Sequence, residues 1–214
     1  MKAYTFGFND LDKEVTLINL EIKGAIPTWL EGTLFRTGPA RFNLEKRKIT
    51  HWFDGLAMLH SFSFHNGKVS YANKFLKSAA YQGAMKQGKM VSRGFATDPC
   101  RSIFKRVASF FMQTPYDNGN VNISRLANEY VALTEIPIPV IFDPKTLDTK
   151  GPYTFEDYIK GQTTTAHPHF DFEKQESKSF LLLLDARNFQ EIGMAILPHH
   201  IPFGFHGNYY RALH

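Results

Sequence analysis

Short runs of alternating apolar and polar residues recur along the chain, a pattern typical of β-strands. The clearest run covers residues 56–76, where Phe alternates with Ser before Asn66 and Gly67, and Val and Tyr alternate with polar residues after them. Asn-Gly between two alternating runs is a strong signal for a two-residue hairpin turn. The sequence therefore predicts a β-hairpin over residues 56–76.

Other stretches repeat this pattern of strand and turn. Residues 120–136 predict a hairpin with its turn at Ala127 and Asn128, and residues 179–197 predict a strand, a tight turn and a second strand. Two further strands are expected to end at turn signals, the first at Gly38-Pro39 and the second at Asp143-Pro144. Such closely spaced hairpins favour an all-β fold, either a sandwich or a propeller. The strands would make roughly two to three four-stranded blades, too few to close a ring alone.

One segment, residues 98–113, has the pattern of a helix. Asp98 can cap its N-terminus and Pro99 suits the first helical position. Apolar side chains gather on one face, at Ile103, Val107, Phe110 and Phe111. Basic side chains flank this face, at Arg101, Lys105 and Arg106. This pattern leaves two interpretations open: an amphipathic helix packed on its own sheet, or a helix that lies at a membrane surface.

Composition narrows the class of protein. Hydrophobic residues make up 43% of the chain and charged residues 21%, which excludes wholesale disorder. The 20 Phe and 9 Tyr favour sheet, and they suit either a Phe-rich core or a protein that handles an apolar ligand. The net charge of +5 comes from scattered residues, so we expect no nucleic-acid partner. A weakly basic surface remains compatible with anionic membranes.

Cysteine content and hydropathy bear on location. The only cysteine is Cys100, which excludes an intramolecular disulfide framework. The first residues contain no long apolar stretch of the kind found in secretory signals, and no window is long and apolar enough to span a bilayer. We therefore expect a cytoplasmic location, with peripheral contact to a membrane if the second interpretation of residues 98–113 holds.

The nine histidines are the main candidates for chemistry. The sequence has no HExxH, CxxC, GxSxG or phosphate-loop motif. His167 lies where a Thr-rich run meets a proline, and His206 lies between Gly204 and Gly207, which permit close approach of the backbone. A neutral imidazole is a good ligand for iron, zinc or copper, but a lone histidine in a strand is more often a packed or surface residue than a ligand. Spacing alone therefore leaves both interpretations open.

Several segments in order closely resemble the carotenoid cleavage oxygenase family, which includes the retinal pigment epithelium isomerohydrolase. They are "IPTWLEGTLFRTGPARF", "HWFDGLAMLHSFSFHNGKVSYANKFL", "FATDPCRSIFKRV", "DNGNVNISRL", "LTEIPIPVIFDPKTLDT", "TTAHPHFD" and "FLLLLDARNFQEIGMAILPHHIPFGFHG". The resemblance covers nearly the whole chain, and "PHHIPFGFHG" is similar to the microbial branch.

The resemblance implies an all-β fold, a seven-bladed β-propeller in which four histidines hold one non-haem ferrous iron, Fe(2+), on the axis. Three glutamates orient the ligand imidazoles, which fixes their tautomer. Members cleave a double bond of a carotenoid or apocarotenoid with dioxygen. An apolar tunnel positions the polyene against the metal.

The family motifs assign roles to particular residues. The resemblance makes His167 and His206 iron ligands and Glu135 an orienting carboxylate. It places His169, His199 and His200 outside the iron shell, and it gives the residues around His51–Gly55 a structural role. It also makes residues 98–113 the membrane-contacting segment near the tunnel mouth, through Phe104, Val107, Phe110 and Phe111.

Full-length members of the family are much longer than this chain. Residues 1–171 correspond to the N-terminal blades, residues 180–214 to the closing blade, and residues 172–179 replace the blades between them. The chain thus offers two of the four histidine ligands and one of the three glutamates, and two imidazoles hold ferrous iron weakly. We do not expect the spare histidines to complete a site with Glu135. The alternatives are a non-catalytic remnant that binds an apolar ligand or a membrane surface, and a rearranged gene product without independent function.

Overall fold

The computed structural model describes residues 3–91, 94, 116–126, 128–134, 138–154, 180–185, 190–201, 204 and 207–211. These residues form twelve β-strands, one α-helix and two short 3-10 helices, so the predicted all-β class is confirmed. In chain order the elements are η1 (Ala3–Phe8), β1 (Val15–Asn19), β2 (Glu21–Gly24), β3 (Gly32–Arg41), η2 (Trp52–Asp54), β4 (Leu56–His65), β5 (Lys68–Phe75), α1 (Ala79–Gln87), β6 (Asn122–Leu126), β7 (Glu129–Leu133), β8 (Val140–Phe142), β9 (Thr149–Pro152), β10 (Phe180–Leu184), β11 (Glu191–Ile196) and β12 (Gly207–Arg211).

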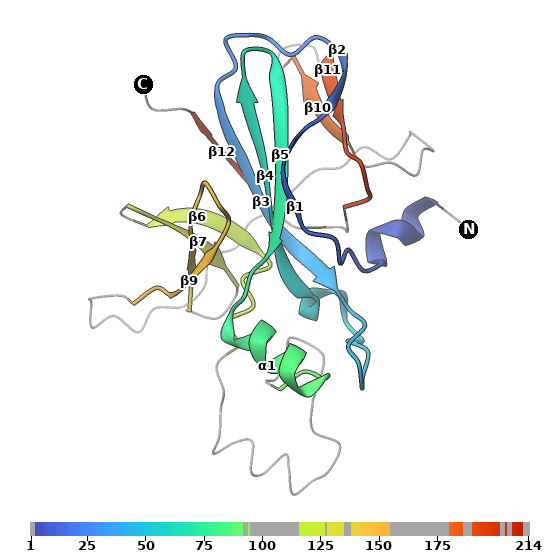
Figure 1. Ribbon diagram of the computed structural model, residues 1–214, viewed down its shortest axis with the longest axis vertical. Coiled ribbons are helices and arrows are strands. Elements are labelled where there is room, and N and C mark those ends of the chain that lie inside the picture. The colour runs from blue at the N-terminus through green and yellow to red at the C-terminus, as the bar shows by residue number, and fades with distance from the viewer. Residues whose placement is uncertain are drawn as a thin grey trace, which may run out of the picture.

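The central sheet has five antiparallel strands in the order β1-β5-β4-β3-β12. Figure 1 shows β3, β4 and β5 as a long twisted ribbon through the middle of the molecule. Strands β4 and β5 form the predicted hairpin, and its turn residues Asn66 and Gly67 have φ angles of 47° and 71°. Positive φ at both positions is what a type I′ turn requires, so the Asn-Gly signal was read correctly.

Strand β3 does not break at Gly38-Pro39, as the turn signal had predicted. Gly38 pairs with Met58 and Pro39 with Ala57, and the strand continues to Arg41 across a shift in register. A β-bulge lets a strand accommodate a proline, which cannot donate to the ladder, without ending. The prediction of a turn here was therefore wrong.

A second sheet holds four antiparallel strands in the order β6-β7-β8-β9. Leu126 pairs with Glu129, so β6 and β7 form the hairpin predicted over residues 120–136. The turn predicted at Asp143-Pro144 separates β8 from β9, and Asp143 accepts hydrogen bonds from the backbone N–H groups of Lys145 and Thr146. This local pattern is an Asx turn.

The third sheet joins the two ends of the chain. Its order is β10-β11-β2, so the early strand β2 pairs with the late strand β11, with Met194 opposite Lys23. In the same way β12 pairs with β3 of the central sheet, with Gly207 opposite Arg36. Figure 1 shows this third sheet beside one end of the central ribbon and the β6–β9 sheet on its other flank.

Two apolar cores hold the sheets together. One lies between the central sheet and the β6–β9 sheet, where Phe35 meets Phe142 edge to face with ring centroids 5.7 Å apart. The other lies between the central sheet and the β2–β10–β11 sheet, and contains Phe62 and Ala195. Burying a side chain such as Phe62 stabilises the fold by about 1.5–3 kcal/mol.

Helix α1 was missed by the sequence analysis. Ser78 caps it by accepting from the backbone N–H of Tyr81, and Gly88 ends it in the left-handed conformation. The helix predicted over residues 98–113 lies outside the described residues. Within the part of the chain that the structure covers, no helix is long and apolar enough to cross a bilayer.

Candidate functional site

The residues predicted to carry the chemistry all lie outside the described part of the chain. These are His167, His206 and Glu135, together with the membrane-contact residues Phe104, Val107, Phe110 and Phe111. Their roles therefore stay predictions. The described residues do show what lies around the glycines that flank His206 in the sequence.

Both of these glycines pack against one side chain, Arg36 of β3. A Cβ added to Gly207 would lie 2.3 Å from Cγ of Arg36, and one added to Gly204 would lie 2.9 Å from its Nη2. A side chain at position 207 would clash with the stem of Arg36, so this contact explains the glycine at that position. At position 204 the nearest atom is the flexible end of the guanidinium, which can move aside.

Arg36 belongs to a polar row that crosses the central sheet. His60 of β4 is paired with both Arg36 of β3 and Asn73 of β5. Directly opposed residues lie on the same face of a sheet, so the three side chains are neighbours. Asn73 fixes the segment before β1 to this row, because it accepts from the backbone N–H of Val15 at 2.6 Å and donates to the carbonyl of Lys13 at 3.0 Å.

His60 is neutral in this environment. Its Nδ1 lies 2.8 Å from the hydroxyl of Tyr71, and it is buried. Burial is the main cause that lowers the pKa of His60 well below its usual value; the charge of Arg36, and that of His199 when it is protonated, act in the same direction. Burial likewise raises the pKa of Tyr71. The pair therefore consists of two neutral groups joined by one buried hydrogen bond.

The ring of His199 lies against Tyr71, with ring centroids 5.5 Å apart. Its Nδ1 is 2.9 Å from the carbonyl oxygen of His200. Because a carbonyl only accepts, Nδ1 must carry the proton, and the neutral ring then has an unprotonated Nε2. That atom is buried and has no hydrogen-bond partner among the described residues. Burial lowers the pKa of His199, which favours this neutral form.

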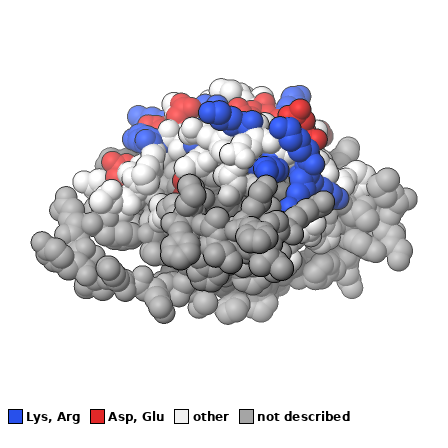
Figure 2. Space-filling view, turned by 90° about the horizontal axis from the view of Figure 1, so that it is seen from below, with Lys and Arg blue, Asp and Glu red and all other residues white. Residues whose placement is uncertain are grey.

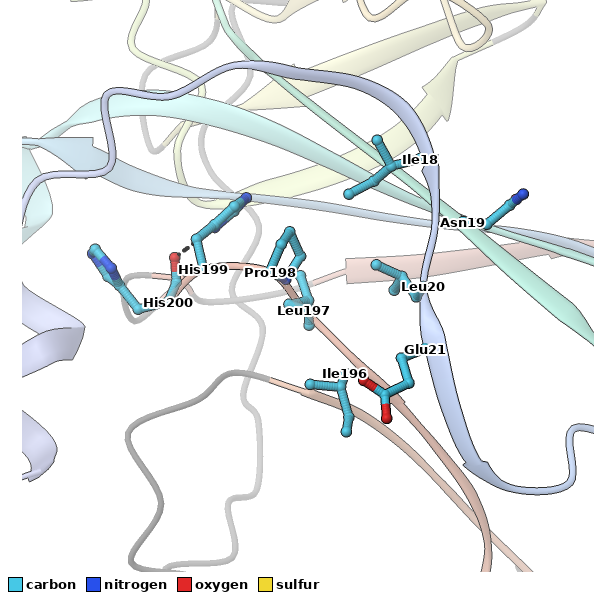
Figure 3. A pocket seen from close by; sticks show the side chains of 9 residues that line it. All are labelled: Ile18, Asn19, Leu20, Glu21, Ile196, Leu197, Pro198, His199 and His200. Atoms are coloured by element: carbon cyan, nitrogen blue, oxygen red, sulfur yellow. Dashed lines mark hydrogen bonds between the residues drawn. The ribbon is translucent and has the colours of Figure 1, made fainter.

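His199 and His200 line a pocket of ≈ 400 Å³ between two segments. Figure 3 shows the connection from β1 to β2 on one side and the residues after β11 on the other, with the two imidazoles at one end. The remaining lining residues are Ile18, Asn19, Leu20, Glu21, Ile196, Leu197 and Pro198. The family motifs predicted only a structural role for the two histidines, and their place in this pocket was not predicted from the sequence.

The motif "HWFDG" has a structural role in the described residues. His51 caps η2 by accepting from the backbone N–H of Phe53. Asn118 donates to the carbonyl of Gly55 at 2.8 Å and accepts from the N–H of Ala57 at 2.9 Å. This buried amide therefore satisfies backbone groups on both sides of the start of β4, which agrees with the interpretation of His51–Gly55 as structural.

The described residues alone do not form a metal site. Among them, no group of three or more His, Cys, Asp and Glu side chains could hold an ion. On the face seen in Figure 2, basic and acidic side chains lie mixed along the rim of the described surface. An iron site in this chain would thus depend on His167 and His206, whose imidazoles are suitable donors for ferrous iron.

Known proteins resemble this chain over most of its length. A family model described as Retinal pigment epithelial membrane protein matches residues 8–177 and again residues 172–211. The Beta,beta-carotene 15,15'-dioxygenase of Gallus gallus is 38% identical over 161 residues, which cover 72% of this chain and 31% of that protein. The mitochondrial Carotenoid-cleaving dioxygenase of Homo sapiens is 36% identical over 165 residues, which cover 73% of this chain and 28% of that protein.

Solved structures agree in fold. A variant of the Synechocystis apocarotenoid oxygenase superposes with a TM-score of 0.65 at 29% identity, over 78% of this chain and 35% of the other. The cobalt-substituted form of that oxygenase gives a TM-score of 0.59 at 28% identity, over 71% and 31%. This likeness and the three unclosed sheets confirm the prediction of an incomplete propeller. The chain spans about a third of the length of the relatives it matches.

Proposed function

This chain belongs to the Retinal pigment epithelial membrane protein family, and we propose that it serves the iron(II)-dependent oxidative cleavage of a carotenoid or apocarotenoid double bond. The observation that carries the proposal is its identity of 36–38% to carotenoid dioxygenases of animals. In such a cleavage one C=C bond and one dioxygen molecule give two carbonyl groups. Bound ferrous iron would supply the activation of dioxygen.

The proposal gives His167 and His206 the role of ligands, and Glu135 the role of fixing one ligand imidazole by a hydrogen bond. Arg36 packs against Gly204 and Gly207, the described residues nearest to His206 in the sequence. The described residues provide no metal site of their own.

The two matches to the family meet between residues 172 and 177. This arrangement supports the prediction that residues 172–179 stand in place of the central blades. A chain that contributes two of four imidazoles will bind iron more weakly than the complete cage, since each missing ligand removes favourable coordination. We therefore expect cleavage only with ferrous iron in excess.

Anaerobic reconstitution with excess ferrous iron tests the proposal. Bound iron per chain is measured by anaerobic equilibrium dialysis, which keeps the excess iron present, and cleavage is measured by chromatography of the products from a β-apo-carotenal after oxygen is admitted. We expect both signals in the wild-type chain, their loss in His206→Ala and His167→Ala, and their retention in the matched control His200→Ala. A wild-type chain that neither retains iron nor forms product would overturn the proposal. Binding of the polyene by such an iron-free chain would instead support the non-catalytic alternative.

A further inference from the structure

The hairpin of β10 and β11 is apolar on both of its faces. One face packs into the core beneath the central sheet, where Leu181, Leu183 and Ala195 lie with Phe62. The alternate residues of both strands therefore point away from that core. They are Phe180, Leu182, Leu184, Met194 and Ile196, and we call them the outer hairpin face. Beyond a shift in register, the exposed Glu191 is paired with Leu184 at one end of this face.

The outer hairpin face is a continuous surface. Phe180 is paired with Ile196 and Leu182 with Met194, so these side chains lie side by side across the two strands. Phe180 is 36% exposed and Leu184 39% exposed. A strand whose five residues are all apolar, as in "FLLLL", is typical of a strand that is covered on both sides. Among the described elements, only the central sheet covers this hairpin.

Strand β10 is also an edge strand of the described sheet. The order β10-β11-β2 gives β10 one described neighbour, and the strand carries no charge to discourage pairing. Exposed apolar edges of this kind promote association with another chain. Figure 1 shows the hairpin at the margin of the molecule, away from the β6–β9 sheet.

Charged residues border the outer hairpin face on its other side, in β2. Lys23 is paired with Met194 and Glu21 with Ile196, and both charged residues are exposed. The pairing places their side chains on the same face as Met194 and Ile196. The surface thus consists of an apolar centre with Lys23 and Glu21 along one rim and Glu191 at the end beside Leu184.

We propose that the outer hairpin face binds a second copy of this chain in a two-fold dimer. When two such faces stack antiparallel about an axis at the level of Ala195, Glu21 of each copy lies opposite Lys23 of the other. The same operation places Phe180 opposite Leu182 of the second copy. A two-fold interface requires a self-complementary surface, and this arrangement of charges and apolar residues provides one. Face-to-face sheets pack about 10 Å apart with interdigitating side chains.

Sedimentation velocity over a range of chain concentrations tests the proposal. We expect dimers that dissociate on dilution, and a monomer for Leu182→Lys at all concentrations. The matched control is Trp29→Ser, because Trp29 is 73% exposed and lies outside this face. A chain that is monomeric throughout, or a dimer that Leu182→Lys leaves intact, overturns the proposal.

A charge exchange separates the proposed contact from an effect on folding. Lys23→Glu and Glu21→Lys each place like charges opposite one another, and each should weaken the dimer by about tenfold, the equivalent of about 1.4 kcal/mol. The double variant Glu21→Lys/Lys23→Glu restores opposite charges across the axis and should recover the wild-type dissociation constant. Single variants as tight as the wild type, or a double variant as weak as the singles, would contradict the two-fold arrangement.

Discussion

The Nδ1 atom of His60 and the hydroxyl of Tyr71 form a buried hydrogen bond of 2.8 Å between neighbouring strands of the central sheet. The two rings lie nearly parallel, with centroids 6.1 Å apart. His60 lies on β4 and Tyr71 on β5, so the bond can form only when the two strands pair in this register. It also joins the row that begins at Arg36 to the ring of His199.

Substitution Tyr71→Phe removes the hydroxyl and leaves Nδ1 of His60 buried without this partner. We expect the free energy of unfolding to fall by about 1–3 kcal/mol, the usual cost of an unsatisfied buried polar group. Chemical denaturation measures the change. Tyr209→Phe is the control, because Tyr209 is 42% exposed and water can replace its hydroxyl contacts. An equal decrease in the free energy of unfolding for the two variants would show that the buried hydrogen bond does not stabilise the fold.

Stability should decline as the pH falls below about 6.5. The pKa of His60 is lowered by burial, so the unfolded chain binds a proton that the native chain rejects. The stabilisation is complete above the ordinary pKa of 6.5 and is lost progressively toward the lowered pKa, with a slope of up to about 1.4 kcal/mol per pH unit. Burial also lowers the pKa of His199, so this residue likewise makes the fold less stable as the pH falls. Denaturation curves between pH 7.5 and 5, wherever the chain stays folded, should show a shallower slope for His60→Gln. An unchanged slope would rule out His60 as a source.

Helix α1 should depend on Asp117. The carboxylate of Asp117 accepts from the backbone N–H of Ala79 at 2.8 Å and of Ala80 at 2.7 Å, two donors that the first turn cannot satisfy itself. We expect Asp117→Ala to lower the free energy of unfolding by about 1–3 kcal/mol. Asp148→Ala, which removes an exposed carboxylate beside Lys74, should have a much smaller effect. Comparable losses for the two variants would argue against the capping role.

The turn between β4 and β5 requires residues that tolerate the left-handed conformation. A Cβ at Gly67, where φ is 71°, would lie 3.0 Å from the carbonyl oxygen of Ile26. We expect Gly67→Val to cost about 1–3 kcal/mol, and Gly67→Asn to cost less, because asparagine adopts this conformation more readily than a β-branched residue. Thermal unfolding of both variants measures their relative stability. A Gly67→Asn variant that is less stable than Gly67→Val would contradict the prediction.

Local signals explain which parts of the fold could be predicted. Asn66 and Gly67 specify a turn by their own conformational preferences, so that hairpin followed from two residues. Ser78 and Gly88 were comparable signals for α1, but its glycine-containing and weakly amphipathic sequence concealed the helix. Pro39 wrongly predicted the end of a strand. The bulge that accommodates it depends on the pairing of Arg41 with Leu56 in another strand, which the local sequence does not show.

Long-range pairing explains the rest. Nothing in the sequence near Lys23 shows that it lies beside Met194, because that register depends on the core shared by the two sheets. The same limit applies to the candidate site. The family motifs nominated His167 and His206, whereas the contact of Arg36 with Gly204 and Gly207 emerged only from the structure. The burial of His199 against Tyr71 was equally hidden, because the two residues lie far apart in the chain.

The pairing of β2 with β11 has a consequence for synthesis. Strand β2 is synthesised long before its partner β11, because strands β3 to β10 lie between them in the chain. At typical rates of about 5–20 residues per second, β2 waits on the order of ten seconds or more. During that interval its edge and the core it covers stay open to other chains. Productive folding of this protein is therefore expected to depend on its concentration and on chaperones, more than for a protein whose strands pair in the order in which they are made.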